Sequence, residues 1–176
     1  MRALPRLLVN SLLLAGVFGV TVSAADLRPA AIPGTTLTLA VPNNWGPVLP
    51  ADGTVLRLGA ANGQAGLSVT VSPLLPGQGS GAFTDASLTE LRRMAYGFEL
   101  LDWDFERHIG ARAWSLLHYR IGIGETRWEQ QLWLTVENGQ GIAVACSATP
   151  AAWAAWQPVF ARCVAEAGVS RPVLKK

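Results

Sequence analysis

The sequence has few of the residues on which most enzymes and nucleic-acid-binding proteins depend. Its 176 residues include only two histidines, two cysteines and two methionines, and 15% are charged. Two histidines exclude a three-histidine zinc site. Without Arg2 and Arg6, which belong to the leader described below, 12 basic residues stand against 12 acidic ones. Phosphate neutralisation dominates nucleic-acid binding, so we expect no nucleic-acid partner.

The sequence motifs of the common catalytic classes are also missing. There is no Gly-x-Ser-x-Gly elbow, P-loop, His-Glu-x-x-His or Cys-x-x-Cys. Gly77, Gly79 and Gly81 have only the spacing of a phosphate loop, because no lysine and helix start follow them. We therefore predict no catalytic residue, no metal site and no cofactor.

The first 24 residues have the pattern of a secretory signal peptide. Arg2 and Arg6 precede a mostly apolar core over residues 7–20, and small residues follow at 22–24. The apolar run is shorter than the roughly 20 residues that a membrane span needs. We expect cleavage near Ala25, a secreted or periplasmic protein and no transmembrane segment after the leader is removed. The expected organisation is a signal peptide (1–24), one domain (25–170) and a flexible tail (171–176).

What the sequence does contain is alternating strand patterns and two helical stripes. Strand patterns occur at residues 35–41, 55–58, 67–71, 103–109, 113–119, 127–136 and 141–148. The short connections among the last four predict an antiparallel meander, and Asn138-Gly139 favours a type I′ hairpin. The expected class is α+β. We expect the meander and the N-terminal strands to form one central antiparallel sheet. Helices pack on this sheet, as in an α/β/α sandwich.

Both helices carry local signals at their ends. Ser87 and Glu90 have the spacing of a capping box, which predicts a helix start at Ser87. A second helix is predicted over residues 150–167. We expect it to break near Pro158, because a proline inside a helix costs about 3 kcal/mol.

Four short segments are similar to those of a known family. They are Leu-Ala-Val-Pro-Asn-Asn-Trp at 39–45, Ile-Gly-Ala-Arg-Ala at 109–113, Glu-Gln-Gln-Leu-Trp at 129–133 and Ser-Ala-Thr at 147–149. With the order of elements, they resemble the PsbP/DcrB-like superfamily of exported domains. The resemblance implies an antiparallel sheet with helices packed on it, and accessory or binding proteins more often than enzymes. It assigns no functional residue.

One strand carries a polar stripe. Alternation places Asp104, Glu106 and His108 on one face, together with Asp102. A three-residue hairpin loop at 110–112 would then place Asp104 opposite His118 and Asp102 opposite Arg120. Such a stripe is either a binding or catalytic site, with carboxylates and histidines for acid–base or metal chemistry, or a solvated face whose opposite charges fix the register.

The seven tryptophans and two cysteines give the remaining candidates. Trp133 shares a strand face with the polar residues at 129, 131 and 135, so it is a candidate exposed binding residue, and Trp45 stays open. The other five, at 103, 114, 128, 153 and 156, are expected in the core. Cys146 and Cys163 predict a disulfide in an exported chain, a bridge that depends on the helix break at Pro158.

We expect an exported, non-catalytic binding or accessory domain whose partner is a protein or an envelope component. Two alternatives remain open. One is a small hydrolase or metal-dependent enzyme using the face of Asp104, Glu106, His108 and His118. The other is a tryptophan-based module that binds glycans or small ligands. The candidate binding residues are Asp104, Glu106, His108, His118 and Trp133.

Overall fold

The computed structural model describes residues 27–49, 53–110, 112–166 and 168–169. The predicted signal peptide (1–24) and flexible tail (171–176) lie outside these ranges. Among the residues described, no helix combines the length and the hydropathy that a membrane span requires.

The described residues form strands and two helices in a simple order. The elements are β1 (Leu27–Ala31), β2 (Leu37–Pro42), β3 (Gly46–Pro47), β4 (Thr54–Gly59), β5 (Ala65–Pro73), α1 (Ser80–Met94), β6 (Glu99–Ile109), β7 (Arg112–Ile123), β8 (Thr126–Glu137), β9 (Gln140–Ala148), α2 (Pro150–Ala165) and β10 (Gly168–Val169). Every strand predicted from alternation is present, most of them longer than the pattern indicated.

The large sheet has seven antiparallel strands in the order β3-β4-β5-β9-β8-β7-β6. Strands β6 to β9 form the predicted meander. The β8–β9 hairpin turns at Asn138 (φ +50°) and Gly139 (φ +73°), both left-handed as a type I′ turn requires. Strand β5 pairs with the free side of β9, and this pairing attaches the N-terminal strands to the meander. The predicted α+β class is confirmed.

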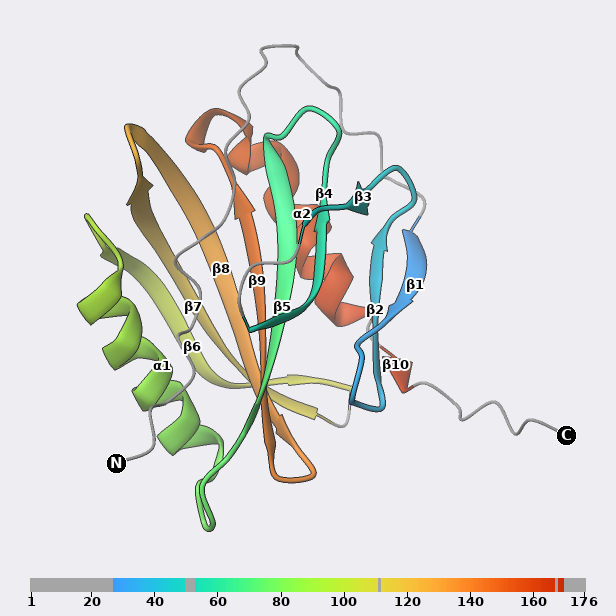
Figure 1. Cartoon of the computed structure of the whole chain (residues 1–176), viewed down its shortest axis with the longest axis vertical. Coiled ribbons are helices and arrows are strands. Elements are labelled where there is room, and N and C mark those ends of the chain that lie inside the picture. The colour runs from blue at the N-terminus through green and yellow to red at the C-terminus, as the bar shows by residue number, and fades with distance from the viewer. Residues whose placement is uncertain (1–26, 50–52, 111, 167, 170–176) are drawn as a thin grey trace, which may run out of the picture.

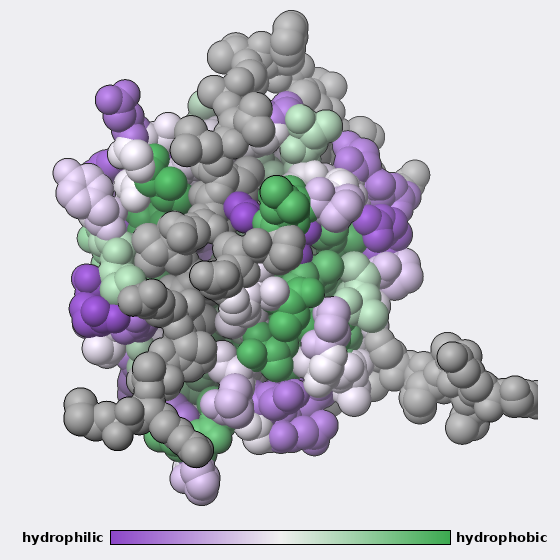
Figure 2. All heavy atoms as spheres, viewed as in Figure 1, coloured by the Kyte–Doolittle hydropathy of each residue, from purple (hydrophilic) through white to green (hydrophobic). Residues whose placement is uncertain are grey.

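Helices α1 and α2 pack on opposite faces of the large sheet (Figure 1). Helix α2 shares its side with a small sheet of order β1-β2-β10, and together they cover the larger apolar core. The smaller core lies between α1 and the other face, and includes Phe83, Leu91, Leu117 and Leu132. On the side shown in Figure 2, hydrophilic residues gather toward the rim and hydrophobic ones form a strip near the centre.

Helix α1 begins seven residues before the predicted start. Gly79 is its N-cap, and Ser87 lies buried inside the helix, where its hydroxyl donates to the carbonyl of Phe83 at 2.8 Å. The capping-box prediction was therefore wrong. The earlier turn buries Phe83 against Gly141, where a Cβ atom would come within 2.6 Å of the Phe83 ring. Packing against the sheet thus outweighs the local capping signal.

Helix α2 is continuous from Pro150 to Ala165, so the predicted break at Pro158 was wrong. A proline removes the hydrogen bond to the carbonyl four residues earlier, which belongs here to Ala154. Ala154 and Pro158 are both exposed. Because water can solvate the released carbonyl, the helix continues while Trp153, Trp156 and Phe160 stay buried on the other side.

Candidate functional site

Strand β6 is an edge strand that exposes two large aromatic side chains. Among the described strands it pairs with β7 alone. Trp103 is 57% exposed and Phe105 is 45% exposed. They are two residues apart on a strand, so their side chains project from the same face of the sheet. Trp103 pairs with Leu117, so this is also the face from which Leu117 projects. Leu117 lies in the core under α1, so the two aromatic rings lie on the face of the sheet that α1 covers. We call Trp103 and Phe105 the aromatic edge.

A bulge in β6 lies directly after the aromatic edge. Asp104 pairs with Leu116 and Arg107 pairs with Trp114, so two residues of β6 stand opposite one residue of β7. Within the bulge, Glu106 has a φ of +82°. A left-handed backbone conformation costs a residue with a side chain about 1–2 kcal/mol. Bulges are common where the edge of a sheet is kept from pairing with another strand, or where a side chain is redirected. The bulge shortens the run of edge backbone that another strand could pair with.

A pocket of about 270 Å³ opens at this bulge, between β6, β7 and the first turns of α1. Its lining residues are Ser80, Gly81, Thr84, Asp85, Phe105, Glu106, Ala113, Trp114 and Ser115. The hydroxyl of Thr84 is held by the carbonyl of Ser80 and by the hydroxyl of Ser115, each at 2.9 Å. The aromatic edge therefore continues into a recess whose lining includes these two hydroxyls.

The strand register differs from the predicted one. Ile109 pairs with Arg112, not with Ala113, and two bulges shift the rest of β6. Asp102 consequently lies opposite His118, and Asp104 lies opposite Leu116. The predicted pairs of Asp104 with His118 and of Asp102 with Arg120 were wrong. Alternation across a hairpin gives the register only when the turn length is known and the strand has no bulge.

The bulge also divides the predicted polar stripe. Asp104 faces the side of Leu116, whereas His108 pairs with Ala113 and faces the other side of the sheet. Glu106 lies in the bulge, and Asp104 forms only a long ion pair with Arg107 on its own strand, at 4.0 Å. Asp104, Glu106 and His108 are all exposed. The structure does not bring these three side chains to one point with His118.

His118 belongs to a different cluster, on the α2 side of the sheet. Its Nε2 lies 2.8 Å from Oε1 of Glu129, and Nε of Arg120 donates to Oε2 of the same carboxylate at 2.9 Å. Trp153 of α2 stacks on the imidazole, with ring centroids 5.0 Å apart and 12° between the planes. The Glu129 side chain is only 7% exposed. This arrangement satisfies a buried carboxylate, and sequence reasoning missed it because Glu129 was placed on an open face.

No group of three or more His, Cys, Asp or Glu side chains within the described ranges is arranged to hold a metal ion. In the cluster of Glu129, His118 and Arg120, one carboxylate is bonded to an imidazole and to a guanidinium. Because the guanidinium is a cation, this cluster is a poor ligand set for a metal ion.

The tryptophans reverse the expected pattern of exposure. Trp133 does share its face with Glu129, Gln131 and Thr135, but helix α2 and the small sheet cover that face and leave Trp133 at 2%. Trp45 is equally buried, against Trp156 and Phe160. Trp103, expected in the core, is the exposed one of the seven. The expectation holds for the four others, at 114, 128, 153 and 156.

Cys146 and Cys163 are both buried free thiols in the structure, so the predicted disulfide is not confirmed. They lie in the same core, on β9 and α2. Burial, and secondarily the neighbouring Cys163, raises the pKa of Cys146. Burial raises the pKa of Cys163 to about 12. Both thiols are therefore protonated and unreactive while the core is closed.

No known sequence family and no curated protein matches the chain. Solved structures do. The chain is similar to cyanobacterial PsbP (CyanoP) from Synechocystis sp. PCC 6803, with a TM-score of 0.65, 18% identity and coverage of 88% of this chain and 98% of that one. It is similar to LpqN, involved in cell envelope biogenesis of Mycobacterium tuberculosis, with a TM-score of 0.60, 12% identity and coverage of 82% and 91%.

A third similar structure is the Saccharomyces cerevisiae Ran-binding protein Mog1p, with a TM-score of 0.58, 11% identity and coverage of 82% of this chain and 96% of that one. Identities this low establish a shared fold and not a shared activity. The antiparallel sheet with helices packed on it agrees with the fold that the resemblance of the sequence segments implied. The chain shares the fold of cyanobacterial PsbP, LpqN and Mog1p.

Proposed function

We propose that this chain is an exported, non-catalytic accessory domain that binds a protein partner through the aromatic edge and the adjoining face of α1. The observation that carries the proposal is the exposure of Trp103 and Phe105, at 57% and 45%, side by side on one face of an edge strand. Aromatic side chains are enriched at the centres of protein interfaces, because each buries a large apolar area at a small entropic cost.

The surroundings of the aromatic edge suit an interface. Asp102, Asp104, Glu106 and Arg107 are exposed on the same strand, which gives an apolar centre with a charged rim. The 270 Å³ pocket begins at Phe105, and offers a recess for one side chain of a partner. The bulge at Glu106 limits continuous strand pairing, so side-chain contacts would supply most of the affinity.

One structural neighbour supports a binding role, and another supports a role in the cell envelope. Mog1p is described as Ran-binding, and LpqN as involved in cell envelope biogenesis. For this chain, an envelope or periplasmic location rests on the leader pattern of residues 1–24, with cleavage near Ala25. The partner we propose is accordingly a protein or a protein-bearing component of the envelope.

Affinity capture from the native envelope fraction tests the proposal. The baits are the natural chain, the double variant Trp103→Ala/Phe105→Ala, and a control variant, Leu75→Ala/Tyr96→Ala. Leu75 and Tyr96 are 68% and 81% exposed, so the control also removes exposed apolar side chains, but outside the aromatic edge. A stoichiometric protein retained by the natural chain and the control, and lost from the double variant, is the expected result. Equal retention by all three baits would contradict the proposed surface.

A further inference from the structure

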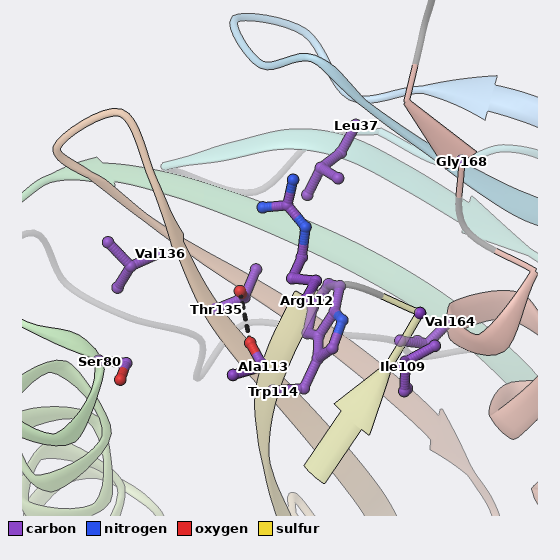
Figure 3. A pocket seen from close by; sticks show the side chains of 11 residues that line it. Leu37, Ser80, Ile109, Arg112, Ala113, Trp114, Thr135, Val136, Val164 and Gly168 are labelled. Carbon is purple, nitrogen blue, oxygen red and sulfur yellow. Dashed lines mark hydrogen bonds between the residues drawn. The ribbon is translucent and has the colours of Figure 1, made fainter. Parts of the chain in front are cut away.

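A second and larger pocket, of about 500 Å³, lies at the tip of the β6–β7 hairpin, where the large sheet, the end of α2 and the small sheet meet (Figure 3). We call it the hairpin pocket. Its lining residues are Leu37, Ser80, Ile109, Gly110, Arg112, Ala113, Trp114, Thr135, Val136, Val164 and Gly168. Its volume falls within the range of roughly 300–1,000 Å³ that is typical of small-molecule sites.

The hairpin pocket has both polar and apolar lining residues, and its apolar backing belongs to the core. Leu37, Trp114 and Val164 are at most 2% exposed and form part of the core beneath α2. Ile109 packs against the same core. Three different elements, β2, β7 and α2, therefore hold this backing in place. A ligand would contact the exposed parts of Ile109, Ala113 and Val136 in front of this backing. Because the backing is already formed, the cost of ordering on binding is lower.

Arg112 is the charged side chain of the pocket lining. Figure 3 shows its guanidinium extending from β7 over Trp114 toward Leu37. Its Nη2 donates to Oε1 of Glu137 at 2.7 Å, and the side chain is 24% exposed. Within the described residues this is its one hydrogen bond, so the remaining N–H groups of its five-donor fork stay available.

Glu137, by contrast, already accepts several hydrogen bonds. The hydroxyl of Thr36 donates to Oε1 at 2.7 Å and the amide of Thr36 donates to Oε2 at 3.1 Å, in addition to the bond from Arg112. Thr135, the other polar residue near Arg112, donates its hydroxyl to the carbonyl of Ala113 at 2.8 Å (Figure 3). The N–H groups that remain for a ligand therefore belong to Arg112, while the carboxylate of Glu137 already accepts hydrogen bonds from the protein.

We propose that the hairpin pocket binds a small amphiphilic carboxylate. Its carboxylate accepts hydrogen bonds from the free side of the Arg112 guanidinium, and its apolar chain lies against Ile109, Ala113 and Val136, which are apolar lining residues with exposed surface. The planar fork of arginine matches a carboxylate in two parallel hydrogen bonds. A neutral polar head makes weaker bonds with the same donors. A cationic head is repelled by Arg112 and finds Glu137 occupied. This binding is separate from the protein-binding surface proposed above.

Three probes of equal chain length test the ligand class: octanoate, octanol and octylammonium. Binding is followed through the amide signals of Gly110 and Gly168 and the indole N–H signal of Trp114 in NMR titrations of the full chain. We expect octanoate to bind about tenfold more tightly than octanol, since a hydrogen bond to a charged group contributes more than 1 kcal/mol. Octylammonium is expected to bind most weakly.

Two variants connect the preference to Arg112. Arg112→Gln should bind octanoate and octanol equally, a loss of about tenfold for octanoate. Glu137→Gln removes the neighbouring negative charge and should bind octanoate about threefold more tightly. Ala113→Leu is a pocket-filling control that leaves the Arg112–Glu137 pair intact, and it should weaken all three probes alike.

Several results would overturn the proposal. The first is equal binding of octanoate and octanol by the natural chain, and the second is an unchanged preference of Arg112→Gln for octanoate over octanol. The third is that the NMR signal changes lie at the aromatic edge and not at the hairpin pocket. The fourth is that no probe binds. If Arg112→Gln does not fold, the response of Glu137→Gln decides: weaker or unchanged octanoate binding would count against Arg112 as the carboxylate site.

Discussion

The imidazole of His118 is held between the carboxylate of Glu129, 2.8 Å from its Nε2, and the indole of Trp153, stacked 5.0 Å away. This relationship joins neighbouring strands of the sheet to helix α2. It places a histidine that the sequence assigned to a solvated strand face beneath a helix, with 17% of its side chain exposed. A role in fixing α2 on the sheet follows from these contacts.

The first prediction concerns that cluster. His118→Ala should lower the free energy of unfolding by about 1–3 kcal/mol, because it removes a hydrogen bond to a buried carboxylate and the contact with Trp153. A solvated pair on the strand face, which is one of the two alternatives that the sequence left open, would cost less than about 1 kcal/mol. Urea denaturation measures the difference, with Arg93→Ala as an exposed ion-pair control. A loss no larger than that of the control would contradict the structural role.

The second prediction separates exposed from buried tryptophan. Trp103→Ala should change the free energy of unfolding by less than about 1 kcal/mol, since the side chain is 57% exposed. Trp133→Ala should cost about 3–5 kcal/mol, because it leaves a cavity under α2. The two midpoints in urea give the comparison directly. Similar losses for both variants would be inconsistent with the position of Trp103 on an open edge.

The third prediction concerns alkaline pH. Burial raises the pKa values of Cys146, Cys163 and Tyr119 above those of the unfolded chain. A group with a raised pKa contributes its stability fully below its unfolded pKa, and the contribution is lost as the pH rises above it. The free energy of unfolding of the reduced protein should therefore fall above about pH 9. Constant stability from pH 7 to pH 11 would contradict the burial of these groups as free acids.

The disulfide between Cys146 and Cys163 is tested separately. The helix break on which the predicted bridge depended is absent. Both thiols nevertheless lie in one core, so for a chain that is exported to an oxidising compartment, as proposed, we still predict the bridge. Alkylation of the denatured, unreduced native protein should label no thiol. Two labelled thiols per chain would show that the cysteines stay reduced. Oxidised protein should also lose less stability at alkaline pH than reduced protein, with the contribution of Tyr119 remaining.

The fourth prediction concerns acid. Burial alone would raise the pKa of Glu137, but hydrogen bonds from Thr36 and Arg112 outweigh it and lower that pKa below the usual value of 4.5. A lowered pKa contributes stability above the unfolded pKa that is lost as the pH falls through the folded one. The natural chain should therefore lose stability below about pH 4.5. Glu137→Gln should be less stable at pH 7 and should show a flatter decline in acid, as measured by urea midpoints.

The fifth prediction is export with cleavage. The intact mass of the native protein should correspond to a chain that starts at Ala25 or within a residue or two of it. Recovery of the full-length chain from the membrane fraction would instead indicate an uncleaved anchor.

The sequence was sufficient for the fold class and for the order of seven strands and two helices, because alternation and short connections depend on local chemistry. The Asn138-Gly139 turn is an example, since its left-handed backbone is a property of two residues. The short strands β1, β3 and β10 were not predicted. The β6–β7 register was not accessible in this way. It depends on a turn that pairs Ile109 with Arg112 and on bulges around Asp102 and Glu106, which the alternation of residues does not reveal.

The candidate site was missed for the same reason. Trp103 and Trp133 both alternate as a buried or half-buried strand residue would, and only the placement of α1 and α2 decides which one is covered. Pro158 gives a similar lesson. Its cost depends on whether the carbonyl of Ala154 faces water, and that is a property of how α2 docks on the sheet.

The affinity of the captured partner for purified variants tests the central claim most directly. Dissociation constants would be measured by isothermal titration calorimetry for the natural chain, Trp103→Ala/Phe105→Ala and the control Leu75→Ala/Tyr96→Ala. If the aromatic edge is the centre of the interface, the double variant should lose about 2 kcal/mol or more, roughly thirtyfold in affinity, and the control should bind as the natural chain does. An affinity of the double variant within about twofold of the natural chain, with its fold intact, would contradict the assignment of the aromatic edge as the binding surface.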